Sequence, residues 1–373
     1  MKTANIFRKT LALVSAALMT LTLAACSSQA PAATAAPAAE SAAPVESAAP
    51  TESAAAEETP AEAGKIYKVG IVKYVDDASL DQIEQSIQAE LDKKGAELGV
   101  TFDYADYTKN GQADSTTLNQ IAADLIADGV DVIIPIATPA ALIMQAATEE
   151  NAIPVVFSAV SDPVGAGLVD SLEAPGSNIT GTSDALNVEA VIDLMLAANP
   201  DLKKLGLLYD QGQDASKSAI AAAKAYCETK GIETVEKTGI TNDELALAAD
   251  ALIAAKVDAV FTPTDNTVMT AELAIYEKFV DAKIPHYAGA DSFALNGAFC
   301  GYGVNYVTLG TSTADIAVDV LVNGAQPASA PVQIMSSGIA TVNTEVASAI
   351  GLDYSAFASL WEELKETITQ ESF

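Results

Sequence analysis

The chain is poor in cysteine, histidine and basic residues. Its 373 residues include 3 Cys and 1 His, and 19 Lys and Arg stand against 50 Asp and Glu, which gives a net charge of −31. Nucleic acids and anionic membranes are bound through clusters of Lys and Arg, so this balance excludes both as partners of the protein surface. Cys227 and Cys300 predict two buried thiols, and a disulfide between them stays an open alternative.

Motifs of catalysis are also missing. The chain has no Gly-x-Ser-x-Gly turn, no Gly-rich phosphate loop and no cluster of metal ligands. A hydrolase built on Ser158 or Ser161 would need a general base, and the single histidine, His286, lies in a predicted strand beside a proline. The sequence therefore predicts no catalytic residue, no metal and no cofactor, and it favours a binding protein over an enzyme.

The first 26 residues have the composition of an export signal. Lys2, Arg8 and Lys9 precede an apolar run at 11–23 that is short for a membrane span, and small residues lead to Cys26. The pattern resembles a bacterial lipoprotein signal, in which residues 1–25 are removed and Cys26 carries the lipid. An ordinary secretory signal with an incidental Cys is the alternative.

Residues 26–64 consist almost wholly of Ala, Pro, Ser, Thr and Glu. Such a segment buries too little apolar surface to offset the entropy that it loses on ordering, so we expect a disordered tether. The folded part would then be held at the membrane by its lipid anchor alone.

Strand and helix patterns alternate along the rest of the chain. In the first half, predicted strands at 66–72, 101–107, 131–137 and 153–159 are separated by helical patterns, and a second series of the same kind begins after Gly181. Strict alternation predicts an α/β fold with two doubly wound parallel-sheet lobes, joined by a hinge with a cleft between them.

The tail after the second series is short enough to cross into the first lobe and out again. We therefore assign residues 65–183 and 306–332 to an N-terminal lobe, and residues 184–305 and 333–373 to a C-terminal lobe.

Two helix patterns are more local. Ser79 to Gln82 has the spacing of a capping box that opens a helix. Residues 354–369 predict an amphipathic helix at the end of the chain, with Trp361 docking it.

Polar side chains follow several of the predicted strands at the point where each strand ends. Ligands bind at the carboxyl ends of strands in an open α/β sheet, so these residues describe the rim of a small-molecule site. Thr138, with Ser158 and the N-terminus of the following helix, would hold a carboxylate, and Asp265 or Asp291 would hold an ammonium group. Thr138, Asp265 and Asp291 could instead be plain helix caps. The predicted ligand contacts are Tyr74, Thr138, Pro139, Ala140, Ser158, Ala159, Ser161, Tyr209, Thr264, Asp265, Asn266 and Asp291.

Aromatic side chains near the same loops could stack on an aromatic ligand. Each of them could equally belong to the core of a lobe. They are Tyr74, Phe157, Tyr209, Phe293, Tyr302 and Tyr306.

Four segments carry a resemblance to a known family. They lie at 153–157 (Ile-Pro-Val-Val-Phe), 161–164 (Ser-Asp-Pro-Val), 175–181 (Pro-Gly-Ser-Asn-Ile-Thr-Gly) and 302–306 (Tyr-Gly-Val-Asn-Tyr). With the lipoprotein signal and the two lobes, they resemble the solute-binding lipoproteins of one family of ABC transporters, over about residues 65–352. The resemblance implies the type I periplasmic-binding-protein fold and a monomer outside the cytoplasm. It implies as partners a small-molecule solute, an ABC permease and its ATPase subunit.

The resemblance also bears on the solute. Members of that family with a known ligand mostly resemble binders of tryptophan, tyrosine or phenylalanine, which implies an aromatic L-amino acid. Another solute, such as a sugar, a nucleoside or a different amino acid, is one alternative. A lipoprotein receptor that senses its ligand without transporting it is another.

Overall fold

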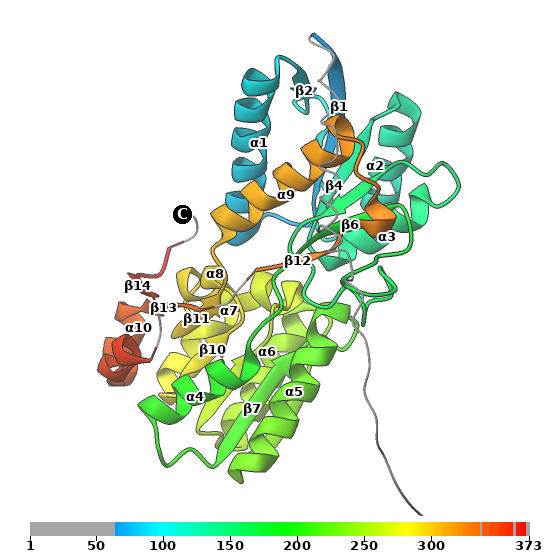
Figure 1. Cartoon of the computed structure of the whole chain (residues 1–373). Helices are drawn as coiled ribbons and strands as arrows, with labels where there is room; N and C mark the ends of the chain where they lie inside the picture. Colours follow the sequence, from blue (N-terminus) through cyan, green and yellow to red (C-terminus); the bar gives the residue numbers. More distant parts are fainter. Residues whose placement is uncertain (1–63, 336–337, 361–362, 371–373) are drawn as a thin grey trace, which may run out of the picture. The chain divides into compact units, whose positions relative to one another are not determined.

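The computed structural model describes residues 64–335, 338–360 and 363–370. The predicted signal peptide, its lipidation site Cys26, nearly all of the predicted tether and Trp361 lie outside these residues. Within them, no helix combines the length and the apolar character that a membrane span requires. The described chain forms two α/β lobes, each built on a sheet of seven strands, as the alternation of patterns predicts (Figure 1).

The first sheet takes six strands from the first half of the chain and one from near its end. The strands are β1 (Ile66–Lys73), β2 (Thr101–Asp103), β3 (Thr108–Asn110), β4 (Val132–Ile136), β5 (Val155–Phe157), β6 (Ile179–Ser183) and β12 (Gln333–Ile334). Their order is β12-β6-β5-β4-β1-β2, β3 also pairs with β1, and every pairing is parallel.

Helices cover both faces of this sheet. They are α1 (Ala78–Leu98), α2 (Ser115–Asp128), α3 (Thr138–Thr148) and α9 (Tyr306–Val322), followed by the short turn η1 (Pro327–Ser329). Alternate residues of β4 divide between the two faces: Ile134 packs in the core with α1 and α9, and Ile133 in the core with α2 and α3. A strand covered on both sides reads as a continuous apolar run, which is why the sequence pattern located it.

The second sheet holds the remaining strands. They are β7 (Lys204–Tyr209), β8 (Glu233–Thr238), β9 (Ala259–Thr262), β10 (His286–Ala288), β11 (Cys300–Gly303), β13 (Ile339–Asn343) and β14 (Glu363–Thr367). Their order is β14-β13-β11-β10-β9-β7-β8, with β13 antiparallel to β11 and the other pairings parallel. The helices of this lobe are α4 (Val188–Ala198), α5 (Asp214–Lys230), α6 (Asn242–Ala254), α7 (Asn266–Ala282), α8 (Asp291–Leu295), α10 (Thr344–Ile350) and the turn η2 (Ser355–Ser359).

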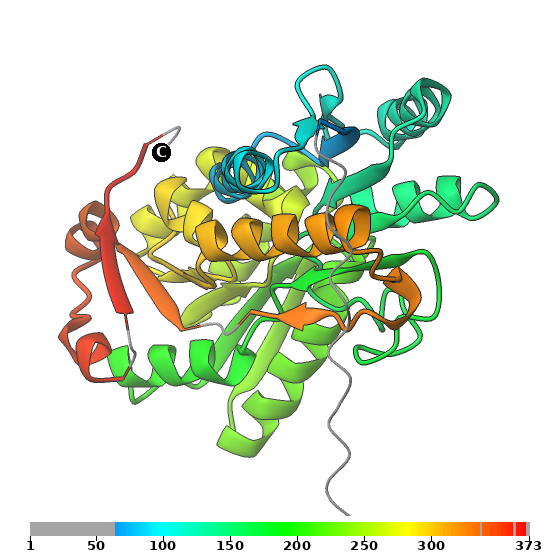
Figure 2. The ribbon, with the colours of Figure 1, turned by 45° about the horizontal axis from the view of Figure 1, so that its top comes forward.

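The chain passes between the two sheets three times. It leaves the first sheet after β6, returns with α9 after β11, and enters the second sheet again between β12 and β13. Helix α9 lies beside α1 in both views of the ribbon (Figures 1 and 2), and Gly310 permits this, because a Cβ atom there would lie 2.6 Å from the carbonyl oxygen of Ile83. The path is compatible with the residue bounds that we assign to the lobes, which stay a prediction.

Two local predictions are wrong. Helix α1 begins after Asp77, whose side chain accepts hydrogen bonds from the backbone N–H groups of Ser79 and Leu80, and not at the capping box read from Ser79. The predicted helix at 354–369 is instead the turn η2 followed by strand β14, which pairs along β13. The backbone N–H and C=O groups on the edge of β13 need partners, and a strand supplies them where a helix cannot.

The two thiols and the histidine are buried in the second lobe. Cys227 and Cys300 are buried and form no disulfide, so the prediction of two buried thiols is confirmed. Burial raises the pKa of the Cys227 thiol to about 11. His286 is buried with Nδ1 2.9 Å from Glu272 Oε1 and Nε2 2.8 Å from Thr262 Oγ1.

Candidate functional site

A pocket lies between the two sheets, at the carboxyl ends of their strands. The space in it that water-sized molecules can occupy is about 40 Å³. The first sheet contributes the starts of α1 and α3 and the residues after β5 and β6, and the second contributes the residues after β9 and β10. The lining residues are Asp77, Ser79, Leu80, Ala137, Thr138, Ala159, Ser161, Asp184, Ala215, Thr264, Asp265, Asn266, Met269, Ala290, Phe293 and Tyr306.

Two alanines shape the pocket through their backbone. Ala137, after β4, has φ 81°, and Ala159, after β5, has φ 54°. A positive φ is rare for a residue with a side chain and costs about 1 to 3 kcal/mol, so it persists where the surrounding structure imposes it. The chain turns at both points and places only a methyl group at the pocket wall.

The structure brings half of the predicted contacts together. Those that line the pocket are Thr138, Ala159, Ser161, Thr264, Asp265 and Asn266. Among the aromatic side chains considered from the sequence, Phe293 and Tyr306 also line it. Phe157 and Tyr302 belong instead to the apolar cores of the lobes.

The other predicted contacts do not line this pocket, and their contact with a ligand stays a prediction. The hydroxyl of Ser158 lies 2.8 Å from Thr313 Oγ1 on α9, because successive side chains of an extended chain point to opposite faces. The phenol of Tyr209 donates a hydrogen bond of 2.8 Å to Glu236, away from the cleft. The predicted contacts that lie outside this pocket are Tyr74, Pro139, Ala140, Ser158, Tyr209 and Asp291.

Two of these residues connect the lobes without lining the pocket. Asp291, at the start of α8, accepts a hydrogen bond of 2.7 Å from the Ser79 hydroxyl on α1. Burial raises the pKa of Asp291. Burial also raises the pKa of Tyr74, and the side chain of Gln213 in the other lobe acts in the opposite direction.

Asp265 is held entirely by protein groups. Oδ1 accepts hydrogen bonds from the backbone N–H groups of Thr267 and Val268, so this residue caps α7. Oδ2 accepts from the backbone N–H of Asp210 at 2.8 Å and from the Ser216 hydroxyl at 2.6 Å. The carboxylate lines the pocket, but its acceptor positions are already occupied.

Two further carboxylates line the pocket, and the sequence did not reveal them. Asp77 caps α1 through Oδ1, and its other oxygen, Oδ2, is buried and makes no hydrogen bond among the described residues. Asp184, between β6 and α4, accepts a hydrogen bond of 3.0 Å from the Ser161 hydroxyl. Ser161 in turn lies 2.8 Å from Thr264 Oγ1, which connects the two lobes at the pocket wall.

Burial dominates the electrostatics of these acids. It raises the pKa values of Asp77, Asp184 and Asp265 to about 6 each. The backbone N–H of Leu80 and the hydroxyl of Ser292 act in the opposite direction on Asp77. A cation placed in the pocket would favour the ionised forms further.

The hydroxyl of Thr138 is buried and has no hydrogen-bond partner within the described chain. It does not cap α3, because the N-cap residue is Ala137 and no side chain bonds to the first turn. A buried polar atom without a partner costs free energy, and one at a pocket wall is placed to bond a ligand.

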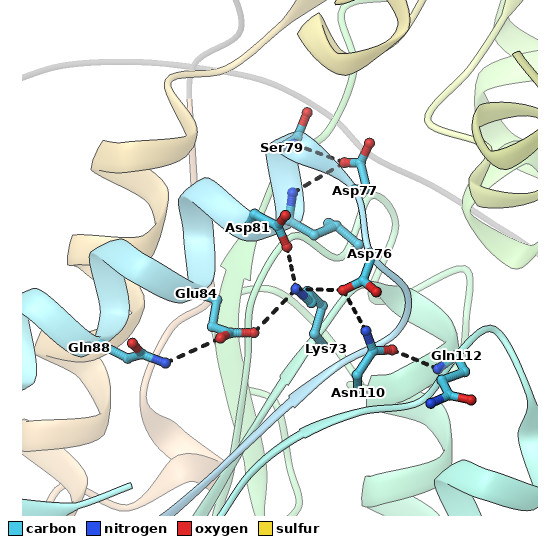
Figure 3. Close-up of polar contacts among 10 residues, drawn as sticks. Lys73, Asp76, Asp77, Ser79, Asp81, Glu84, Gln88, Asn110 and Gln112 are labelled. Carbon is cyan, nitrogen blue, oxygen red and sulfur yellow. Dashed lines mark hydrogen bonds and ion pairs between the residues drawn. The ribbon is translucent and has the colours of Figure 1, made fainter. Parts of the chain in front are cut away.

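The pocket offers no positive charge from its walls. No Lys, Arg or His is among the lining residues, and the described residues contain no group of three potential metal ligands. Lys73, at the end of β1, is engaged elsewhere: Figure 3 shows its Nζ atom directed to the carboxylates of Asp76, Asp81 and Glu84. The site therefore suits a ligand with a donor or cationic group.

Comparisons with known proteins agree with a binding role. The sequence model of a family described as ABC transporter substrate binding protein matches residues 68–359. The chain is 31% identical, over 293 residues, to a tyrosine-binding protein of Clostridioides difficile, a match that covers 78% of this chain and 83% of that protein.

Solved structures resemble the lobes closely. An ABC domain from Streptococcus pneumonia in complex with L-Trp has a TM-score of 0.74 and is 30% identical, covering 80% of this chain and 100% of that one. The ligand-free, open structure of a substrate-binding protein with adhesive properties from Clostridium difficile has a TM-score of 0.63 and is 32% identical. The match covers 82% of this chain and 100% of that one.

Proposed function

We propose that this chain, which belongs to the substrate-binding proteins of ABC transporters, captures an aromatic L-amino acid outside the cytoplasm and delivers it to a membrane permease and its ATPase. The family is one of binding proteins and not of enzymes, and the chain has its type I periplasmic-binding-protein fold. One observation carries the proposal: a single pocket combines a carboxylate oxygen and a hydroxyl at a helix start, both without a hydrogen-bond partner among the described residues, with two aromatic side chains.

Each part of an aromatic amino acid has a partner in this pocket. The ammonium group would bond Asp77 Oδ2 and the carboxylate of Asp184, which take the role that the sequence assigned to Asp265 or Asp291. The carboxylate would accept from the Thr138 hydroxyl and lie at the N-terminus of α3. The ring would pack on Phe293 and Tyr306.

Calorimetry tests the solute. We expect tryptophan, tyrosine or phenylalanine to release or absorb heat on binding to the domain 65–373, and arginine and free sugars to give none. A sugar or nucleoside that binds while all three aromatic amino acids fail would make this assignment wrong. The mass spectrum of whatever copurifies with the domain is an independent check.

Ligand binding should couple to closure of the lobes. The contacts Ser79 to Asp291 and Ser161 to Thr264 join the lobes beside the pocket, and a solute that bonds both sides favours the arrangement that makes them. We expect small-angle scattering to show compaction when the ligand-free domain is saturated with its solute. An unchanged curve at saturation would argue against closure.

The anchor is a separate part of the proposal. Lipidation at Cys26 would hold the protein at the outer face of the membrane, so Cys26→Ser should move it out of the detergent phase while solute binding by the domain is unchanged. Equal partitioning of mutant and wild type would exclude this anchor.

A further inference from the structure

The charges at the pocket are strongly one-sided. The carboxylates of Asp77, Asp184 and Asp265 line it, and no basic side chain among the described residues does. Burial raises the pKa of the Tyr306 phenol well above its usual value, and the charges of Asp184, Asp291 and Asp77 act in the same direction. A phenol at the pocket wall thus experiences the negative field of three acids.

Lys73, the basic residue nearest to Asp77 in the sequence, does not offset this negative field. Lys73 is buried and pairs with Asp76 at 3.1 Å, with Glu84 at 3.6 Å and with Asp81 (Figure 3). Three carboxylates around one ammonium group leave this cluster negative, so it adds to the potential that a solute meets.

The carboxylate of Asp77 has one oxygen that no donor among the described residues bonds. Asp77 is more than nine-tenths buried, and Oδ2 makes no hydrogen bond of normal geometry, although the Ser292 hydroxyl is near enough to favour the ionised form. A buried carboxylate oxygen without a hydrogen bond costs free energy unless a ligand donates a hydrogen bond to it. A protonated amine supplies both the hydrogen bond and the countercharge.

The start of α3 at the pocket wall is a weak anion site. Its side-chain donor is the neutral Thr138 hydroxyl, and Pro139 in the first turn of α3 removes one backbone N–H from the set that a helix start usually offers. A ligand carboxylate there gains a hydrogen bond and the helix dipole, but it meets no cation and shares the pocket with three acids.

We propose that the protonated amine is the obligatory element of recognition and that the ligand carboxylate is dispensable, so that aromatic monoamines bind about as tightly as the corresponding amino acids. The inference rests on the proposed function, because it takes the solute to be aromatic. It widens the ligand class from aromatic L-amino acids to aromatic primary amines, of which the amino acids are one kind.

Three matched probes test this on the wild-type domain 65–373 by calorimetry. They are L-tyrosine, tyramine, which lacks the carboxylate, and 3-(4-hydroxyphenyl)propionate, which lacks the amine; the corresponding indole compounds form a second set. We expect the Kd of tyramine to be no more than tenfold above that of tyrosine, and the propionate to bind at least 100-fold more weakly than tyramine. A larger loss for tyramine, or a smaller one for the propionate, overturns the inference and leaves the proposed function standing. If no aromatic amino acid binds, the proposed function fails.

A substitution locates the amine. Asp77→Asn keeps an oxygen to cap α1 but removes the charge, so we expect tyramine to bind at least 30-fold more weakly. Asp114→Asn is the matched control, because Asp114 caps α2 in the same way, is exposed and does not line the pocket; we expect its effect to stay within twofold. Unchanged tyramine affinity in Asp77→Asn, with the control also unchanged, would overturn the inference.

Discussion

Asp77 and Asp265 occupy comparable positions in the two lobes and differ in how far the protein satisfies them. Each is buried, lines the pocket and caps a helix through Oδ1. Oδ2 of Asp265 accepts two hydrogen bonds, from Asp210 and Ser216, whereas Oδ2 of Asp77 accepts none in the described chain. A buried carboxylate that the protein satisfies in full serves the fold, and one that it leaves half satisfied is available to a ligand.

The largest effect should come from Asp265→Asn. The amide nitrogen would face the two donors that now bond Oδ2, and both would be left buried without an acceptor. We expect the free energy of unfolding of the ligand-free domain to fall by about 2 to 4 kcal/mol, measured by urea denaturation. If the variant instead has normal stability but binds the solute weakly, Asp265 contacts the ligand, as the sequence predicts.

Lowering the pH should protonate Asp77, Asp265 and Asp184 and so change the stability of the domain. Burial raises their pKa values from 3.8, the ordinary value for Asp, to about 6 in the folded protein. Between about pH 4 and pH 6 the folded state therefore binds more protons than the unfolded state, so its stability falls as pH rises through this window. We expect the ligand-free domain to be more stable at pH 5 than at pH 7, by about 1 kcal/mol for each group.

Bound solute should respond in the opposite sense. An ammonium group favours the ionised forms of Asp77 and Asp184, so the rise in melting temperature that L-tryptophan produces should shrink from pH 7 to pH 5. Thermal unfolding with and without the amino acid measures both trends. A ligand-induced rise that grows on acidification would contradict the assignment of these acids to the amine.

Thr138→Val extends the comparison to a neutral group. Valine keeps the shape of the side chain and removes a hydroxyl that has no partner within the described protein. We expect the ligand-free domain to be stabilised by about 0.5 to 1 kcal/mol, while the affinity for an aromatic amino acid falls about tenfold. Lower stability with unchanged affinity would show that the hydroxyl serves the fold.

The smallest loss of stability should come from Asp77→Asn. Asparagine caps helices about as well as aspartate, and the nearby Ser292 hydroxyl can accept a hydrogen bond from an amide as well as donate one to a carboxylate. The unfolding free energy at pH 7 should not decrease, because the substitution also removes the cost of burying the charge of Asp77. A loss as large as that of Asp265→Asn would show that the two caps do not differ.

Most of the fold could be predicted from the sequence because its signals are local. The apolar run of β4 and the patterns of the helices around it determine where each element lies, and the alternation of elements determines the sheet type. Strand β14 could not be predicted, because residues 363–367 are polar and their conformation depends on the free edge of β13, which is distant in sequence.

The site could be predicted only as a set of strand ends. Which side chain of Ser158 and Ala159 points to the pocket depends on the positive φ of Ala159, and no residue pattern signals that angle. A different interpretation of the start of α1 would have found Asp77, since Asp before a helical run is itself a cap signal. Asp184 follows β6 where the chain crosses between lobes, and only the three-dimensional path places it beside Ser161.

The return of α9 to the first lobe has a consequence for the nascent chain. Leu309 and Ala314 of α9 share a core with Ile83 and Ile87 of α1, and β12 extends the same sheet. The second lobe likewise obtains β13 and β14 from the last part of the sequence. Neither lobe can reach its native core until the ribosome has nearly finished the chain, and contacts so distant in sequence form slowly. Folding of both lobes is thereby delayed until synthesis of the chain is almost complete.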